Sequence, residues 1–221
     1  MSSTPNRFWP RTIWTGTVLL VLIGVAAVVI RTVVLVTGPR AGRADVDSGF
    51  AHHPLLTLIH IVPGLVFFLI APLQFVRRLR NRAPRVHRWM GRVAVLLGLA
   101  IGISALAISF RIAIGGINEI AATVLFDVLF LFCLAKGWMC ARRRDFVHHR
   151  EWMIRMFGIG LGIATTRPIM GVFFATSRLT GLTPHQFFGT AFWLGFTLTV
   201  IAAESWINYT RPRLQRTGPA R

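Results

Sequence analysis

The chain has 221 residues, of which 54% are hydrophobic and only 14% charged, and its formal net charge is +18 at pH 7. Its apolar runs are much longer than the core of a soluble domain requires, which excludes an ordinary globular protein. The two cysteines exclude a disulfide framework and, without a second pair, a four-cysteine zinc site.

Six long apolar runs follow one another along the chain. Each is near or above the roughly 20 residues that a helix needs to cross the hydrocarbon layer. Because that layer contains no water, the backbone N–H and C=O groups of such a run must bond to each other, which a helix allows. We therefore expect an all-α integral membrane protein with a single membrane domain. Spans 2–5 would form a four-helix core, flanked by spans 1 and 6. The runs cover about residues 12–37, 53–76, 87–110, 118–140, 151–176 and 186–209.

Positive charge is distributed unevenly between the connections of these spans. Of the 25 basic residues, 19 lie near the N-terminus, in residues 77–92, in residues 136–155 and from residue 211 onward. By the positive-inside rule, both basic loops and both tails (1–10 and 211–221) are cytoplasmic, which is expected for a protein of a cytoplasmic (inner) membrane. The arginines would contact anionic lipid headgroups, so we expect lipids as partners and no nucleic acid.

A short basic motif occurs twice, each time where a basic loop meets the next apolar run. The first copy contains His87-Arg88-Trp89-Met90 and the second His149-Arg150-Glu151-Trp152-Met153. The repeated placement predicts that spans 2–3 and spans 4–5 form an internal two-helix repeat. It would bring two histidines to matching depths. A one-residue insertion leaves open whether His148 or His149 corresponds to His87.

Ionisable residues inside the spans are candidates for an intramembrane site, because they are costly in lipid and normally face the bundle interior. Five such residues are expected in the outer half of the membrane, where they could converge on one polar site. This site could bind a ligand, a proton or a quinone, could ligate a metal or haem through the histidine, or could hold the helices together by hydrogen bonds. The five residues are His60, Arg111, Glu119, Asp127 and Arg167.

The paired histidines of the repeat suggest a haem. Two imidazoles on facing helices, His87 with His149 or His148, are suited to the two axial positions of one iron. Nearby arginines could pair with the haem propionates. The alternatives are an interfacial anchor that holds lipid headgroups and a site for another anionic ligand. The arginines concerned are Arg88, Arg150 and Arg155.

At these residues the chain resembles a family of bacterial membrane proteins known as domain of unknown function number 2306, over roughly residues 50 to 175. The motifs are His60 with Pro63-Gly64, Gln74-Phe75, His87-Arg88 with Gly91-Arg92, and His149-Arg150 with Trp152-Met153-Ile154-Arg155. The family name implies a membrane protein and no particular activity.

A more distant similarity is to the two-haem cytochrome b superfamily, carried by His53-Pro54-Leu55-Leu56, the basic loop and His87. That similarity implies pairs of histidines that bind haem b on a four-helix core. The fourth span has no histidine, so the similarity implies one bis-histidine haem at most.

Two functional hypotheses follow. The first is a membrane electron-transfer protein with one haem b between spans 3 and 5, in exchange with a quinone or another redox partner. The second is a cofactor-free carrier or assembly protein that uses His60 and Asp127 as a proton or substrate site. The sequence does not decide whether the protein is an enzyme or an oligomer.

Overall fold

A computed structural model describes residues 8–39 and 44–216, and almost all of them are helical. Within these ranges no strand is present, so the all-α prediction is confirmed. The elements are α1 (Phe8–Thr37), α2 (Ala44–His52), α3 (Pro54–Ile70), the 3₁₀ helix η1 (Pro72–Phe75), α4 (Arg77–Arg82), α5 (Pro84–Ile112), α6 (Gly116–Arg142), α7 (Phe146–Thr180) and α8 (Pro184–Arg216).

Six of these helices are long and apolar enough to cross a membrane, as predicted: α1, α3 with η1, α5, α6, α7 and α8. Their outward faces carry large apolar side chains with high exposure, among them Leu96 at 67% and Val172 at 64%. In water such faces would cause aggregation, whereas in a bilayer they face acyl chains. The protein is therefore a multi-pass membrane protein.

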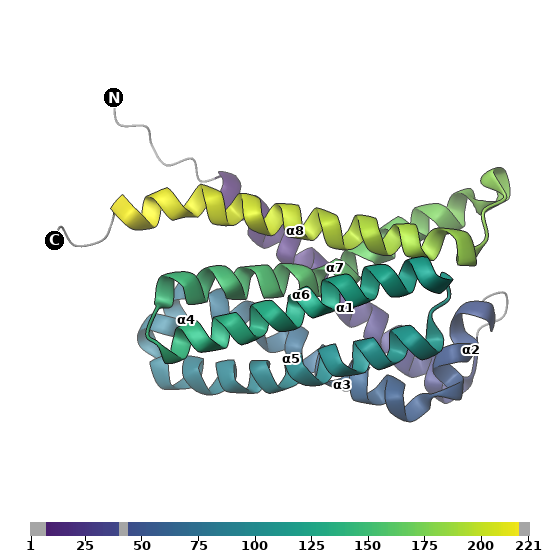
Figure 1. The fold of residues 1–221 in the computed structure, drawn as a ribbon, viewed down its shortest axis with the longest axis horizontal. Helices are drawn as coiled ribbons and strands as arrows, with labels where there is room; N and C mark the ends of the chain where they lie inside the picture. Colours follow the sequence, from purple (N-terminus) through teal and green to yellow (C-terminus); the bar gives the residue numbers. More distant parts are fainter. Residues whose placement is uncertain (1–7, 40–43, 217–221) are drawn as a thin grey trace.

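The long helices run side by side and alternate in direction (Figure 1). One end of the bundle carries α4, the α6–α7 connection and the ends of the described chain; we call it the termini end. The other end carries α2, the α5–α6 connection and the α7–α8 connection; we call it the opposite end. The predicted tails lie at the termini end. Residues 8–10 and 211–216 are helical there, and the remainder lies outside the described residues.

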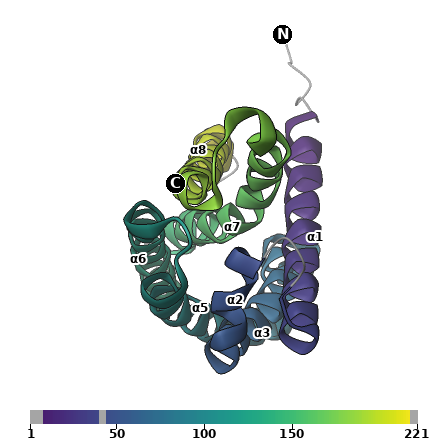
Figure 2. The same cartoon turned by 90° about the vertical axis from the view of Figure 1, so that its right-hand side faces the viewer.

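The core is formed by spans 2–5 together with the last span. As predicted, α3, α5, α6 and α7 pack together in sequence, α3 on α5, α5 on α6 and α6 on α7. The last helix, α8, lies along both α6 and α7, so it belongs to the core and does not merely flank it (Figure 2). The reason is a row of buried side chains on its inner face, Phe187, Phe188, Ala191, Phe192 and Phe196. The first helix, α1, packs on α3 and α7 and keeps most of its surface toward lipid.

Close contact between helices depends on small residues. A Cβ at Gly158 of α7 would lie 2.8 Å from the Cβ of Ala203 of α8, and a Cβ at Gly102 of α5 would lie 2.5 Å from Leu131 of α6. Both positions therefore require glycine at the present helix separations, which is how small residues bring membrane helices together.

The two basic segments between spans are partly helical. Residues 77–82 form α4, and α5 begins at Pro84, whose fixed φ suits the first turn of a helix. Helix α7 begins after Asp145, whose side chain accepts a hydrogen bond from the backbone N–H of His148 at 3.2 Å and another from its ring at 2.7 Å. These hydrogen bonds hold the pKa of the Asp145 carboxyl below its ordinary value. Both helix starts are thus fixed locally, and the repeated motif lies in the first turns of α5 and α7.

Candidate functional site

A cavity of about 390 Å³ lies inside the bundle, toward the opposite end. Residues of all six long helices line it. Most of the wall is apolar, including Phe67, Phe68, Ile101, Phe130, Met170 and Phe192. Four ionisable residues interrupt this wall: Arg31, His60, Glu119 and Arg167. Such a space accommodates an apolar body with one polar end.

The polar part of the wall is centred on Arg167 of α7. Its Nε is sealed from solvent, and no hydrogen-bond partner for this atom is present among the described residues. The guanidinium lies within electrostatic range of Glu119, His60 and Arg31. The following residue is Pro168, which has no N–H, so the carbonyl of Ala164 on the cavity wall lacks its helical donor. A hydrogen-bond donor, Arg167 Nε, and an acceptor, the carbonyl of Ala164, are therefore both available near this part of the wall.

The second polar group is His60 of α3, which is held by α5. Its Nδ1 lies 3.0 Å from the Oγ of Ser104. The Ser104 hydroxyl donates its hydrogen to backbone carbonyls of α5, the nearer being Ala100 at 2.6 Å. Because that hydrogen is used, Ser104 accepts from His60 Nδ1, and Nε2 of the neutral ring is left as an acceptor. His60 can thus accept a hydrogen bond from a molecule in the cavity, whereas Arg167 can donate one.

The remaining charges at the cavity are balanced. Glu119, in the first turn of α6, accepts a hydrogen bond from the backbone N–H of Gly115 at 2.6 Å. Arg31 of α1 donates to Asp47 of α2 at 3.0 Å, and its guanidinium lies over the ring of Phe50. Two arginines and two carboxylates therefore give a formal charge of zero around the polar part of the cavity.

The structure brings three of the five predicted intramembrane residues to this cavity, namely His60, Glu119 and Arg167. Arg31 was not predicted as a site residue. An arginine inside an apolar run is costly in lipid, so its position in the first run could have identified it in the same way as the other five. Asp127 does not line the cavity: it faces α5, with Oδ1 3.3 Å from where a Cβ on Gly102 would lie. Within the described part of the chain its Oδ2 has no partner.

The fifth predicted residue, Arg111, is also placed elsewhere. It lines a separate hollow of about 450 Å³ at the opposite end, between the α5–α6 and α7–α8 connections, beside His185. The predicted convergence of all five residues is therefore not what the structure shows. Among the described residues, His60 forms its side-chain hydrogen bond with Ser104 and not with Asp127.

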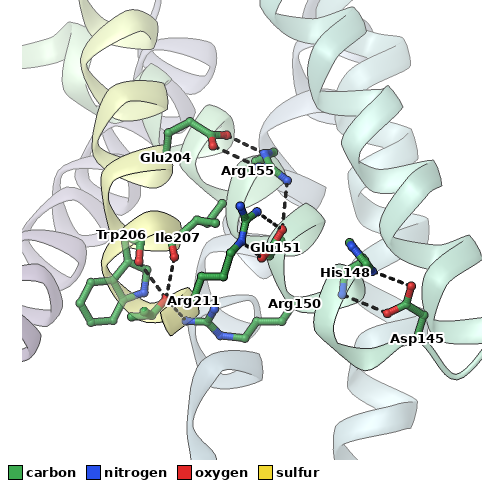
Figure 3. Close-up of polar contacts among 10 residues, drawn as sticks. Asp145, His148, Arg150, Glu151, Arg155, Glu204, Trp206, Ile207 and Arg211 are labelled. Atoms are coloured by element: carbon green, nitrogen blue, oxygen red, sulfur yellow. Dashed lines mark hydrogen bonds and ion pairs between the residues drawn. The ribbon is translucent and has the colours of Figure 1, made fainter. Parts of the chain in front are cut away.

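The histidines of the repeated motif lie at the termini end. His87 and His149 are each the fourth residue of their helices, α5 and α7, and they are close enough to interact electrostatically. His149 Nδ1 donates to the carbonyl of Gly137 on α6 at 2.8 Å. His87 Nδ1 is buried, with no partner among the described residues. His148 is exposed and bound to Asp145 (Figure 3), so His149 is the structural counterpart of His87.

The neighbouring arginines have different surroundings. Arg155 lies over the ring of Trp152 and binds Glu204 of α8 through two nitrogens, at 2.5 and 3.0 Å. Arg150 donates through Nη2 to Thr210 of α8 at 2.9 Å (Figure 3). Arg88 is exposed on α5. Of the three arginines expected to bind an anionic ligand, Arg155 is already bound to carboxylates.

Comparison with known protein families gives one finding. A family described as predicted membrane protein, DUF2306, matches residues 57–207, and the chain belongs to this family. The match runs from α3 into α8, which agrees with α8 as part of the core. Among the curated proteins and the solved structures, no significant match is found. The family assignment confirms a membrane protein of unknown activity, and the more distant similarity to cytochromes b stays a prediction.

Proposed function

We propose that the protein is a membrane carrier that binds a neutral amphipathic molecule of the quinone class in the cavity around His60 and Arg167. The observation that carries this proposal is the buried, unpartnered Nε of Arg167 on the wall of a mostly apolar cavity among the membrane-spanning helices. A buried cation with unused donors is costly, so it indicates a ligand that accepts hydrogen bonds.

The charge balance around the cavity supports a neutral head. Arg31 is bound to Asp47, and Glu119 lies within electrostatic range of Arg167. A ligand carboxylate would add an uncompensated negative charge, whereas a carbonyl oxygen accepts from Arg167 without changing the balance. The Nε2 of His60 can accept from a hydroxyl, so the pair suits both the carbonyl and the hydroxyl form of a quinone head. The aromatic and aliphatic wall suits the ring and the tail.

Binding of a short-chain ubiquinone analogue to the detergent-purified protein tests the proposal. We expect quenching of the tryptophan fluorescence with a measurable Kd, and a Kd weakened about 10- to 100-fold in Arg167→Met, from the loss of a hydrogen bond to a charged group. Arg167 lies within electrostatic range of Glu119, so Arg167→Met leaves that buried carboxylate without its compensating charge. The Tm of each variant is therefore measured beside its Kd, and weaker binding with an unchanged Tm reflects the lost contact. The matched control is Arg178→Met, an exposed arginine on the same helix. Equal Kd values for wild type and Arg167→Met would refute the proposal.

A haem b at the termini end is the second candidate. Its support is that His87 of α5 and His149 of α7 lie on helices across the bundle from each other (Figure 2) and within electrostatic range. His149 has the arrangement of an iron ligand, because Nδ1 donates to a carbonyl and Nε2 is left for the metal. His87 lacks that support, since its Nδ1 has no partner in the described residues. His87 and His149 would hold the iron, and a bound haem would supply one-electron transfer.

The haem hypothesis has a direct test in the absorption spectrum of the purified protein, oxidised and then reduced. A b-type band that is lost in His87→Ala and in His149→Ala would establish it. His185→Ala and His60→Ala should leave such a band unchanged, because both residues lie toward the opposite end. A colourless protein from cells supplied with haem would exclude this candidate and leave the carrier proposal in place.

A further inference from the structure

Three buried nitrogen atoms at the termini end lack a hydrogen-bond partner among the described residues. They are Nε2 of Gln74 in η1, Nδ1 of His87 in α5 and Nη1 of Arg150 in α7. Buried polar atoms in folded proteins are almost always hydrogen-bonded, so three unpartnered ones in one region require an explanation. Each belongs to a side chain that can donate.

The three side chains belong to elements that meet at η1, which contacts both α5 and α7. Gln74 lies against α5, with Oε1 3.5 Å from where a Cβ on Gly91 would lie. Gly91 is four residues after His87 and therefore on the same face of α5. The ring of Phe75 contacts Phe157 at 5.3 Å between centroids, which holds η1 against α7.

Electrostatic contacts connect the same three elements. Arg80 of α4 acts on both His87 and Arg150, and His87 also interacts with His149. Arg80 therefore lies within electrostatic range of one residue on α5 and of one on α7.

Positive charge dominates this region. The half-buried His87 lies within electrostatic range of Arg80 and Arg88, and the half-buried Arg150 lies within range of Arg77 and Arg80. Within the described residues, Glu151 is the carboxylate that acts on Arg150, and Arg211 already binds it through two hydrogen bonds of 2.8 and 2.7 Å (Figure 3). The cluster therefore has donors and positive charge in excess of its acceptors.

We propose that this cluster, Gln74, Arg80, His87 and Arg150, binds a phosphate group. A phosphate offers several acceptor oxygens and negative charge, which would satisfy all three unpartnered donors at once. Arginine is well suited to such an anion because its planar guanidinium matches two phosphate oxygens. The phosphate can come from a lipid headgroup or from a water-soluble phosphate compound. This site is separate from the cavity at His60 and does not rest on the proposed function.

Two probes distinguish the sources of the phosphate. Inorganic phosphate and a short-chain phosphatidylglycerol are each titrated into the full-length protein in a non-ionic detergent, and binding is followed by calorimetry. Comparable affinity for both probes indicates a soluble phosphate compound. An affinity about tenfold higher for the phospholipid indicates a lipid headgroup. Either result supports a phosphate site.

Two variants test the residues. Arg150→Gln should weaken binding of both probes about tenfold or more, since hydrogen bonds to charged groups are the strong ones. Arg150→Gln also removes the hydrogen bond to Thr210 that joins α7 to α8. The second variant is therefore Arg80→Gln, on the exposed surface of α4. The matched control is Arg143→Gln, an exposed arginine in the α6–α7 connection at the same end.

Three outcomes would overturn the proposal. The first is an absence of binding of either probe to the wild-type protein. The second is an equal loss in Arg143→Gln, which would show that only the overall charge matters. The third is a haem band in the wild-type spectrum that disappears in His87→Ala, which would assign the donors to haem propionates.

Discussion

The ion pairs between α7 and α8 allow a quantitative prediction, because two similar carboxylates differ in their burial. Glu151 of α7 is 5% exposed and accepts two hydrogen bonds from Arg211 of α8. Glu204 of α8 accepts two from Arg155 of α7, but its side chain is 40% exposed. Figure 3 shows both pairs on the facing sides of the two helices.

We expect Glu151→Gln to cost about 2 kcal/mol of stability. Removing one partner of a buried pair costs about 3–5 kcal/mol, but the Arg211 side chain is 46% exposed and can regain water, which lowers the cost. Glu204→Gln should cost about 1 kcal/mol or less, because its pair is partly screened by solvent. For a chain of this length, about 1 kcal/mol corresponds to a change in Tm of about 2–4 °C. The expected decreases are therefore about 4–8 °C for Glu151→Gln and less than about 4 °C for Glu204→Gln.

The assay is thermal unfolding of the detergent-purified variants, followed by tryptophan fluorescence at constant detergent and salt. Arg211→Gln and the double variant complete a double-mutant cycle, in which the double variant should lose less than the sum of the single losses. A Tm that decreases more in Glu204→Gln than in Glu151→Gln would refute the argument from burial. Purely additive losses would show that Glu151 and Arg211 do not stabilise each other.

Three further predictions follow from charge, packing and burial. The charge distribution predicts that the termini end is cytoplasmic. In a chain with Cys133 and Cys140 replaced by alanine, Asn81→Cys should then resist an impermeant thiol reagent in intact cells, whereas Thr183→Cys should react. The reverse labelling pattern would show that the topology is inverted. Gly158→Leu should prevent α8 from docking and yield aggregated protein on size exclusion, whereas Gly16→Leu, where a Cβ meets nothing within 4 Å, should behave as wild type. Asp127→Leu should leave Tm unchanged or raise it, because it removes a buried carboxylate with an unpartnered oxygen. A loss of ubiquinone binding in this variant would show that Asp127 takes part in the binding site.

The sequence was sufficient to predict the six spans and the packing of spans 2–5 with one another, but not that the last span joins this core. A run such as residues 186–209 shows only that the segment can cross the membrane. The position of α8 depends on Phe187 and Phe192 fitting against α6 and α7, and on the close approach at Gly158. These are matters of shape between helices distant in sequence, and hydropathy contains no information on them.

The site could be predicted in part, for a reason of helix geometry. The prediction placed Glu119 and Asp127 together because eight residues bring both to one half of the membrane. Eight residues of a helix also rotate the side chain by about 80° from its starting direction. Glu119 therefore lines the cavity, whereas Asp127 faces Gly102 of α5. The depth of a residue in the membrane can be estimated from its position along its own helix. The group that its side chain faces depends on how the neighbouring helices are packed.

The two proposed ligands would bind at two places on one helix, each beside an arginine with an unpartnered nitrogen. Arg150 and Arg167 are 17 residues apart on α7, which corresponds to a distance of about 25 Å along the helix axis. A phosphate bound at Arg150 and a quinone head bound at Arg167 therefore cannot contact each other, and the quinone head carries no charge that could act on the phosphate directly. If α7 behaves as a rigid element, Arg167→Met should leave phosphate affinity within about twofold of wild type, and Arg150→Gln should do the same for ubiquinone affinity. A larger effect in both directions would instead show that Pro168, which interrupts the hydrogen bonds of α7 beside Arg167, couples the two sites through a change in the helix.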